Sequence, residues 1–385
     1  MRIDIAEKRR ANGAPGPRRV ALATGGTAGH VTPALAVADA YRAARPDASV
    51  IFIGSASGFE QRLIAAHGYT FEAIPAAPLY GVTAWRRLQA FSHLAAGVRH
   101  ARRVLAQNGV QLVIGFGGYA SAGAVLAARS LGLAVAVHDA NATPGLTNRV
   151  LAHVVDRILV GWDGALQHVA AGRSRCTGTP IRSTLAALAG APHRPPDAAR
   201  ARVLVYGGSQ GSPFLNRHAP ELAAVLRQSG FAVEVRHVSG REPPQPVRAA
   251  YAAHGIAAEV VEHLHDIAAA YRWADVAVAS AGAVALAELA AAALPALLVP
   301  LAAAAHDHQA SNAAVFAAAT GAPWVREEAW DASAVGRELA ALLADRDAWR
   351  GLSERTARLA RADAAAAVVS ECEALLGAHE RKNEP

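Results

Sequence analysis

The chain has 385 residues, more than one hydrophobic core usually holds, so two domains are expected. Its formal net charge of +7 favours anionic partners, but aromatic residues make up only 5% and no basic stripe interleaved with them is present, which argues against nucleic-acid binding. A phosphorylated substrate or an anionic membrane surface fits this charge better. The cysteines, Cys176 and Cys372, lack metal-like spacing, which argues against a zinc site or a disulfide framework and leaves a reducing cytoplasm as the default.

Residues 1–18 are charged, rich in Gly and Pro, and lack the apolar core of a secretory signal, so we expect a disordered basic tail. No apolar run is long enough to cross a membrane without charges or helix breakers. Residues 283–305 come closest, but Glu288, Pro295 and Pro300 interrupt them. We expect a buried helix and then a buried strand in this stretch.

The first half alternates strands and helices. An apolar strand at 20–23 precedes the glycine loop Gly25–His30, and we expect the next helix to begin with Thr32 as N-cap and Pro33 as first helical residue. A second glycine loop, 117–121, follows the strand at 112–116. Further strands are predicted at 49–54, 71–74, 134–137 and 158–160, and helices at 57–67 and 84–108. This alternation predicts a doubly wound parallel sheet.

The pattern restarts after a proline-rich stretch, 186–200, which we interpret as a linker. A strand at 202–206 leads into the loop Gly207–Gly211 and a second cap-then-proline pair, Ser212–Pro213. A later strand at 275–279 ends in Ser280–Ala283, before a helix that carries Glu288. We therefore predict two similar α/β domains, 19–185 and 201–365, facing each other across a cleft, with a C-terminal helix at 366–385 that packs back on the first. In such sheets ligands bind at the carboxyl ends of strands, where all four glycine loops should lie.

The glycine loops do not have the patterns of common nucleotide-binding motifs. Neither Gly25–His30 nor Gly207–Gly211 has the G-x-G-x-x-G spacing or ends in Gly-Lys-Ser/Thr, which disfavours NAD and ATP chemistry. Each loop is either a tight turn or a place where a phosphate meets backbone amides at the positive end of a helix. His30 is either a capping or core histidine or a general base.

Three other features also have two interpretations. Glu288 either satisfies a helix N-terminus or accepts two vicinal sugar hydroxyls. The stretch 306–308 has two histidines around an aspartate, but no third ligand cluster is evident, so we do not expect a metal site. A group of apolar and aromatic residues near arginines is either a core edge or a surface that dips into a membrane interface. It consists of Leu79, Tyr80, Val82, Trp85 and Phe91 with Arg86 and Arg87.

With these motifs in order, the chain resembles the MurG family, the UDP-GlcNAc-dependent N-acetylglucosamine transferases of peptidoglycan synthesis. The resemblance runs from about Arg19 to the C-terminal helix. In the first half it rests on 25–30, 117–121 and 144–148. In the second half it rests on 207–211, on 280–283 with Glu288, and on His308-Gln309 with Asn312. It implies a GT-B glycosyltransferase of two Rossmann-like parallel-sheet domains.

The resemblance also implies site residues. The diphosphate of a lipid-linked acceptor would be held in the first domain by Gly25, Gly26, Gly29, Gly117, Gly118, Tyr119 and Ser121. UDP-GlcNAc would be held in the second domain, with Glu288 on the ribose, by Ser209, Gln210, Leu264, Gly282, Ala283, Glu288, His308 and Gln309. Thr27, Asn141 and Arg182 would reach this donor from across the cleft.

The implied reaction is a direct displacement that inverts the anomeric carbon and turns lipid I into lipid II. His30 is the first choice for the base and Asp139 the second. No cofactor or metal is obligatory. The patch near Trp85 would hold the chain at the cytoplasmic face of the inner membrane.

The chain departs from the family pattern around the expected cleft. Residues 138–141 read His-Asp-Ala-Asn where the family usually has His-Glu-Gln-Asn, residues 301–305 lack aromatic and polar side chains, and Ala285 and Ala287 replace hydroxyl residues. Three alternatives therefore stay open. The chain could be a divergent relative with another acceptor, such as a natural product or a different glycolipid. It could also be a UDP-GlcNAc 2-epimerase, or a binding module without activity.

Overall fold

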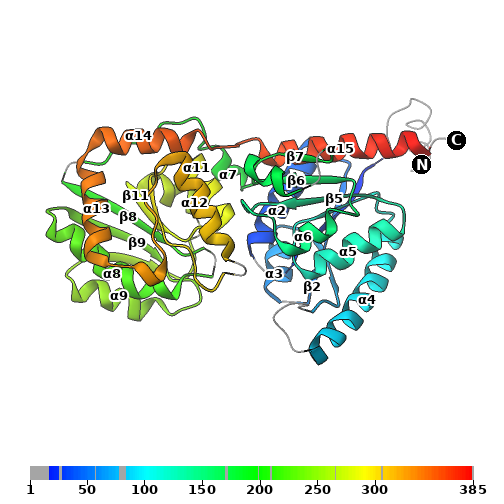
Figure 1. Cartoon of the computed structure of the whole chain (residues 1–385), viewed down its shortest axis with the longest axis horizontal. Helices are drawn as coiled ribbons and strands as arrows, with labels where there is room; N and C mark the ends of the chain where they lie inside the picture. The colour runs from blue at the N-terminus through cyan, green and yellow to red at the C-terminus, as the bar shows by residue number, and fades with distance from the viewer. Residues whose placement is uncertain are drawn as a thin grey trace. The chain divides into compact units, whose positions relative to one another are not determined.

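The computed structural model describes residues 17–25, 28–56, 58–77, 84–169, 172–197, 199–208, 210–264, 266–304 and 307–383 (Figure 1). The chain divides into two units. The first contains the chain up to Ala140, Pro144–Pro180 and the C-terminal stretch from Asp363, and the second contains Asn141–Thr143 and Ile181–Ala362. Each unit is built around its own parallel sheet.

The first unit has a parallel sheet in the order β3-β2-β1-β4-β5-β6-β7. Its strands are β1 (Arg19–Ala23), β2 (Ser49–Ser55), β3 (Thr70–Ile74), β4 (Leu112–Gly115), β5 (Ala134–Asp139), β6 (Arg157–Val160) and β7 (Ser174–Cys176). Its helices are α2 (Ala28–Ala44), α3 (Gly58–Ala66), α4 (Ala84–Gln107), α5 (Tyr119–Ser130), α6 (Leu146–Leu151), the 3-10 helix η1 (Asp163–His168) and α15 (Ala364–Asn383). The strand order reverses between β1 and β4, and the first two glycine loops follow these strands.

Helices cover both faces of this sheet, which explains why its central strands are almost wholly apolar. Along β1, Ala21 and Ala23 belong to a core shared with α4 and α5, while Val20 and Leu22 belong to another shared with α2 and α15. The alternation follows from the period of two residues in a strand. The same rigid sheet therefore fixes the starting points of both glycine loops.

The C-terminal helix α15 belongs to the first unit. Its Val368 and Cys372 are buried in the core next to α2. Arg18 forms ion pairs with Glu373 and Glu380 of this helix and is 4% exposed. The predicted disordered tail at 1–18 is therefore wrong at its end, because Arg18 is anchored by these carboxylates, while residues 1–16 lie outside the described part of the chain.

The second unit has a parallel sheet in the order β10-β9-β8-β11-β12. Its strands are β8 (Arg200–Tyr206), β9 (Ala232–Val238), β10 (Ala257–Val261), β11 (Val276–Ala279) and β12 (Ala296–Leu298). Its helices are α7 (Ser183–Ala186), α8 (Pro213–Gln228), α9 (Pro244–Ala253), α10 (Ile267–Trp273), α11 (Ala283–Ala291), α12 (His308–Thr320), the 3-10 helix η3 (Glu327–Ala329), α13 (Ala332–Ala344) and α14 (Arg346–Ala357). Here the order reverses between β8 and β11, which again precede predicted glycine loops.

The two predicted cap-then-proline pairs have different outcomes. Ser212 caps α8 as predicted, because its side chain accepts a hydrogen bond from the backbone N–H of Leu215 and Pro213 follows at the first helical position. The pair Thr32–Pro33 does not start α2, which begins at Ala28 and contains Pro33. Pro33 lies in the second turn of this helix, where its missing N–H leaves the carbonyl of Gly29, four residues earlier, without an intrahelical donor.

The stretch predicted as a linker packs on the second unit. Its Leu188 is buried, and the two ring nitrogens of His193 lie 3.0 Å from the carbonyl oxygen of Ala292 and 2.7 Å from that of Ala274. These carbonyls belong to the C-cap residues of α11 and α10. The second unit begins at Ile181 instead of after a free linker, because these contacts hold the stretch in place.

Candidate active site

Two glycine loops of the first unit lie in direct contact. A Cβ atom added to Gly25, after β1, would lie 2.5 Å from the Cα atom of Gly118, after β4, so a side chain has no room there. Gly117 and Gly118 have φ angles of 101° and 85°, which residues with a side chain rarely adopt. The two loops that the sequence assigns to the acceptor therefore meet at the reversal point of the sheet.

His30 lies near the start of α2 and faces the second glycine loop. Its Nδ1 atom is 2.6 Å from the carbonyl oxygen of Gly25, and since a carbonyl only accepts, Nδ1 carries the hydrogen. In the neutral imidazole Nε2 is then the acceptor nitrogen. Nε2 would lie 3.0 Å from a Cβ atom placed on Gly117. His30 is thus held in the tautomer that proton abstraction at Nε2 requires.

The helix α5 begins directly at the second glycine loop. Gly118 is its N-cap residue, and no side chain caps it. Unpaired backbone N–H groups and the positive end of the helix dipole suit such a position to an anion. Tyr119 is half-buried here, whereas Ser121 is fully buried and its Oγ atom would lie 2.6 Å from a Cβ atom on Gly115. The assignment of Ser121 to the acceptor stays a prediction, and its hydroxyl is a buried polar atom without a hydrogen-bond partner among the described residues.

Asp139, the second predicted base, holds the start of α6. Its Oδ2 atom accepts hydrogen bonds from the backbone N–H of Gly145 at 2.8 Å and from Nδ2 of Asn148 at 3.0 Å. Asn148 also donates to the carbonyl oxygen of His138 at 3.1 Å. Its Nδ2 atom would lie 3.7 Å from a Cβ atom on Gly117, which places it near His30. Sequence reasoning included Asn148 in a motif without giving it a role, and this contact supplies one.

In the second unit, loops from neighbouring strands gather at the carboxyl edge of the sheet. The backbone N–H of Ser280, after β11, donates to the carbonyl oxygen of Tyr206 at the end of β8, at 3.2 Å. A Cβ atom on Gly208 would lie 3.8 Å from the Ser280 Oγ atom, and the φ angle of Gly208 is 81°. The glycine loops after β8 and β11 therefore lie side by side, as their position at the reversal of the strand order requires.

Gln309, in the first turn of α12, connects the loops after β11 and β12. Its Oε1 atom accepts hydrogen bonds from the backbone N–H groups of Ala281 at 3.1 Å and Leu301 at 3.0 Å. An amide side chain whose oxygen is used in this way still has its NH₂ group as a donor. The geometry therefore orients the donor group of Gln309.

Asn312, one turn further along α12, fixes the short segment Asn141–Thr143. Its Oδ1 atom accepts from the backbone N–H of Ala142 at 2.8 Å, and its Nδ2 atom donates to Asn141 Oδ1 at 3.2 Å and to the carbonyl oxygen of Ala281 at 3.1 Å. Asn312 is fully buried. We expected Asn141 to belong to the first domain, but these contacts place it in the second unit.

Glu288 is buried in α11 and paired at both carboxylate oxygens. Its Oε1 atom lies 3.4 Å from Arg182 Nη2, and its Oε2 atom accepts a hydrogen bond from the Tyr271 hydroxyl at 3.1 Å. The Glu288 side chain is 2% exposed and that of Arg182 is 41% exposed. Arg182 was also expected in the first domain, but it is the N-cap residue of α7 in the second unit.

Burial disfavours the charged form of Glu288, whereas two neighbouring side chains favour it. Burial raises the pKa of Glu288, while the positive charge of Arg182 and the hydrogen bond from Tyr271 act in the opposite direction. Burial, with the charge of Glu288, raises the pKa of Tyr206 and of Tyr271. Both phenols are therefore neutral, and the Tyr271 hydroxyl is available as a donor. The missed residue here is Tyr271, for which the sequence pattern offered no signal.

The other predicted donor-binding residues are spread over the same loops. Gly282 is the N-cap residue of α11 and Ala283 its first residue, Leu264 is half-buried ahead of α10, and His308 is the first residue of α12. Gln210 is exposed and its carbonyl oxygen accepts from the backbone N–H of Arg241 at 3.1 Å. Three predicted site residues lie outside the described part of the chain, namely Gly26, Thr27 and Ser209.

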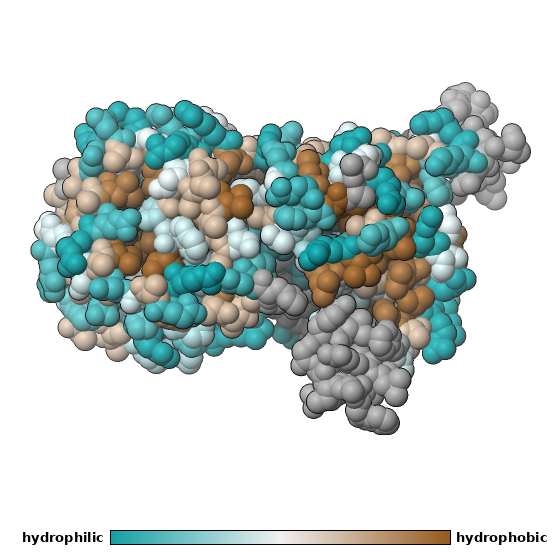
Figure 2. Space-filling view, viewed as in Figure 1, coloured by the Kyte–Doolittle hydropathy of each residue, from teal (hydrophilic) through white to brown (hydrophobic). Residues whose placement is uncertain are grey.

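The predicted membrane patch also lies largely outside the described residues. Leu79, Tyr80 and Val82 are not described, nor are the side chains at 84–91. Elsewhere in the first unit, apolar side chains gather over α5 and α6 on the face shown in Figure 2, and Val150 of α6 is 56% exposed. No helix in the described part of the chain is long and apolar enough to cross a bilayer.

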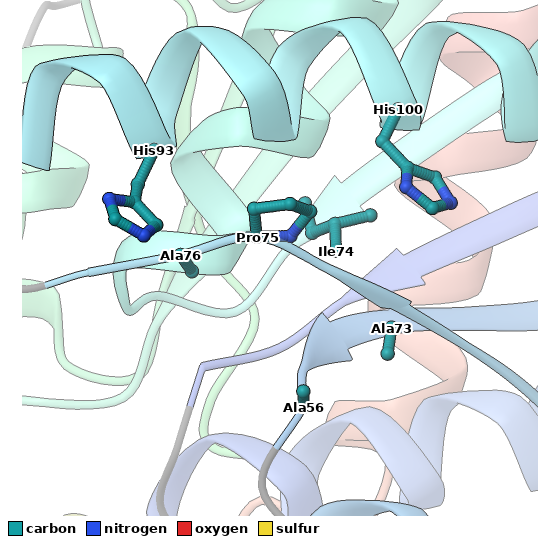
Figure 3. A pocket seen from close by; sticks show the side chains of 7 residues that line it. All are labelled: Ala56, Ala73, Ile74, Pro75, Ala76, His93 and His100. Atoms are coloured by element: carbon teal, nitrogen blue, oxygen red, sulfur yellow. The ribbon is translucent and has the colours of Figure 1, made fainter.

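A hollow of about 390 Å³ lies between α4 and the ends of β2 and β3 (Figure 3). His93 and His100 lie on α4 beside it, with Pro75 and Ala76 opposite. None of the predicted site residues lines this hollow. Within the described residues no cluster of three or more His, Cys, Asp or Glu side chains could hold a metal ion, and Asp307 instead pairs with Arg326 at 2.7 Å.

Comparison with protein families matches both units. Residues 20–160 match the Glycosyltransferase family 28 N-terminal domain, and residues 202–368 match the Glycosyltransferase family 28 C-terminal domain. Together with the two parallel sheets, these matches define a glycosyltransferase with the GT-B fold, as the sequence predicted.

Similarity to individual proteins shows which family of glycosyltransferases the chain belongs to. The chain is 40% identical over 358 residues, 92% of its length, to a UDP-N-acetylglucosamine–N-acetylmuramyl-(pentapeptide) pyrophosphoryl-undecaprenol N-acetylglucosamine transferase of Acidithiobacillus ferrooxidans, covering 96% of that protein. It is 39% identical over 91% of its length to the transferase of the same name from Nitratidesulfovibrio vulgaris, again covering 96% of the relative. The crystal structure of Acinetobacter baumannii MurG matches with a TM-score of 0.75 at 26% identity, over 93% of this chain and 99% of that one. The chain therefore belongs to the MurG family, which confirms the resemblance seen in its sequence.

Proposed function

We propose that the chain transfers N-acetylglucosamine from UDP-GlcNAc to the 4-hydroxyl of the muramoyl sugar of lipid I, giving lipid II in peptidoglycan synthesis. Its relatives are named for a transfer of N-acetylglucosamine to N-acetylmuramyl-(pentapeptide) pyrophosphoryl-undecaprenol. The acceptor oxygen attacks the anomeric carbon, the bond from that carbon to UDP breaks, and the configuration inverts.

The observation that carries this proposal is the orientation of His30. Its Nδ1 atom donates to Gly25, so Nε2 is the nitrogen that takes a proton, and it faces Gly117 in the second glycine loop. We assign to Nε2 the proton of the acceptor hydroxyl, which leaves as the oxygen attacks. Asp139 is the weaker candidate for the base because its Oδ2 atom already accepts two hydrogen bonds from the start of α6.

The contact between the first two glycine loops supports a diphosphate site in the first unit. Gly25 and Gly118 approach each other without side chains, so a phosphate can reach the backbone N–H groups at the start of α5. We assign the acceptor diphosphate to this place, beside the backbone of Gly25 and Tyr119. The positive end of α5 would stabilise its charge.

The second unit offers the groups for UDP-GlcNAc. We assign hydroxyl recognition on the sugar to the NH₂ group of Gln309, whose oxygen is fixed by two backbone donors. We assign the diphosphate to the glycine loops at 207–211 and 280–283, and the ribose to Glu288. Backbone amides and a helix dipole would stabilise the charge of leaving UDP, so we propose that no metal is obligatory.

We also propose that the chain works at the cytoplasmic face of the inner membrane as a peripheral protein. A lipid-linked acceptor stays in the bilayer, so an enzyme that uses it has to reach the membrane surface. The exposed Val150 and the apolar surface over α5 and α6 support this location in the first unit. The patch around Trp85 remains the predicted centre of the membrane contact.

Co-sedimentation with vesicles, with and without anionic lipid, tests this location. If the same fraction of the protein stays in the supernatant with either kind of vesicle as without vesicles, the proposal is contradicted.

The decisive experiment is a turnover assay with purified protein, UDP-GlcNAc and a soluble lipid I analogue, with release of UDP measured in buffer containing EDTA. We expect one UDP per transferred sugar. Turnover only with another acceptor would identify a divergent transferase, and conversion of UDP-GlcNAc without any acceptor would identify an epimerase. Activity that appears only after a divalent metal is added would refute the metal-free mechanism.

A further inference from the structure

We propose that Tyr271 is a positioning residue for donor binding, acting through the hydrogen bond from its hydroxyl to the Glu288 carboxylate. Tyr271 lies in α10 and Glu288 in α11, and the distance from the Tyr271 hydroxyl to Glu288 Oε2 is 3.1 Å. This inference rests on the proposed function, which assigns the ribose of UDP-GlcNAc to Glu288. Tyr271 itself has no direct role in that assignment, because its hydroxyl hydrogen is donated to Glu288 Oε2.

The position of the hydroxyl is fixed by three elements that pack together. The short helix α7, which begins after Arg182, packs against both α10 and α11. The Tyr271 ring makes an edge contact with the ring of Tyr206, with centroids 6.5 Å apart and planes at 78°. A ring held in this way cannot move its hydroxyl without disturbing the end of β8. The hydroxyl therefore acts as a fixed support for one carboxylate oxygen.

The carboxylate needs this support because it is buried. Its charge is balanced by Arg182 on Oε1, at the moderate distance of 3.4 Å, and by the Tyr271 hydroxyl on Oε2. If one oxygen of a buried carboxylate loses its hydrogen-bond donor, the cost of removing that oxygen from water is no longer compensated. Glu288 would then rotate toward Arg182 or take up a proton, and either change removes the acceptor geometry that vicinal hydroxyls require.

The same geometry predicts an effect of pH. The groups that face Glu288 are Arg182 at the start of α7, Tyr271 of α10 and Tyr206 of β8. The hydrogen bond from Tyr271 lowers the pKa of Glu288 against the effect of burial. Its loss raises that pKa, so the ionised form that accepts hydroxyl groups disappears at a higher pH during acidification.

The test compares Tyr271→Phe with the wild-type protein in donor titrations and turnover. We expect the Kd for UDP-GlcNAc, measured by calorimetry, and its KM to rise about tenfold, which is the size of one lost hydrogen bond to a charged group. The kcat should change less than about twofold, and the acid limb of kcat/KM should move to higher pH. An unchanged melting temperature, within a few degrees, shows that the fold is intact.

A matched control is Tyr69→Phe in the first unit. Tyr69 is also buried and its hydroxyl donates to a carboxylate, Asp39, at 2.6 Å, but that carboxylate is exposed and has no assigned role. Tyr69→Phe should leave Kd, KM and the pH profile unchanged. In a Glu288→Ala background, adding Tyr271→Phe should have little further effect on Kd, because the hydroxyl acts only through Glu288.

Two failures are distinguishable. If Glu288→Ala weakens UDP-GlcNAc binding and Tyr271→Phe does not, the positioning role is refuted while the donor site stands. If Glu288→Ala leaves Kd unchanged, the assignment of the ribose to Glu288 fails, and the inference on Tyr271 fails with it. Because Kd is measured without acceptor, a wild-type protein that binds UDP-GlcNAc but does not use lipid I still tests Tyr271.

Discussion

The Nδ1 atom of His30 lies 2.6 Å from the carbonyl oxygen of Gly25, five residues earlier in the chain. This contact turns the imidazole so that Nε2 faces the second glycine loop at Gly117. A general base that acts through Nε2 needs this tautomer. A structural histidine that donates through Nδ1 to a carbonyl has it too, so mutation decides between the two roles.

We predict that His30→Ala lowers kcat by about 10²- to 10⁴-fold, the range typical of a lost general base, and leaves the Kd for UDP unchanged. UDP release and calorimetry measure the two quantities. His67→Ala is a matched control, because the exposed His67, directly after α3, also contacts a backbone carbonyl through Nδ1, that of Leu63 at 2.9 Å. If His30→Ala keeps near-normal turnover, His30 is structural and Asp139 becomes the candidate base.

Asp139→Ala should mainly reduce stability. It leaves the backbone N–H of Gly145 and one donor of Asn148 without their acceptor, so we expect a loss of about 2 kcal/mol in the free energy of unfolding. Urea denaturation measures this loss. Asp47→Ala, at an exposed position, should change stability by less than about 0.5 kcal/mol. A normal denaturation curve combined with lost turnover would instead give Asp139 a chemical role.

The burial of Glu288 predicts how stability depends on pH. Since burial raises its pKa in the folded state, the folded protein binds this proton more tightly than the unfolded chain does. The stability contributed by the protonated form is fully present below the unfolded pKa and is lost as pH rises through the folded pKa. Glu288→Gln cannot ionise and does not lose this stability. As pH rises from the unfolded to the folded pKa of Glu288, the melting temperature of the wild type should therefore fall relative to that of Glu288→Gln.

The control for this experiment is Glu234→Gln. Glu234 is 45% exposed and lies 3.3 Å from Arg200 Nε, so its ionisation has little desolvation cost. The difference in melting temperature between Glu234→Gln and the wild type should stay nearly constant with pH. If the difference between Glu288→Gln and the wild type is also independent of pH, the Glu288 carboxylate is solvated in the folded protein.

His193→Ala should destabilise the second unit. Both ring nitrogens of His193 contact carbonyl oxygens at helix C-caps, those of Ala292 and Ala274. Their loss should lower the free energy of unfolding by about 1 to 3 kcal/mol, as measured by denaturation. His254→Ala, at the exposed C-cap of α9, should have almost no effect. Equal effects of the two substitutions would mean that His193 does not hold the stretch after α7.

Much of the fold follows from local patterns in the sequence. The strand predicted at 49–54 is β2, Ser49–Ser55, and the strand predicted at 202–206 lies within β8, because an apolar run bounded by polar residues decides a buried parallel strand locally. Ser212 and Pro213 start α8 for the same local reason. The glycine loops were also recognisable, since each directly follows its strand.

The sequence by itself thus determined two parallel-sheet domains and their glycine loops, although His30, expected in the first loop, lies in the first turn of α2. Only the tertiary structure decided that Arg182 and Asn141 belong to the second unit, where they meet Glu288 and Asn312, and that Tyr271 supports the Glu288 carboxylate. The physical reason is that strand and cap formation depend on neighbouring residues, whereas the partner of a buried polar group is set by strand order and helix packing. These bring together residues far apart in the chain, and no sequence period records them.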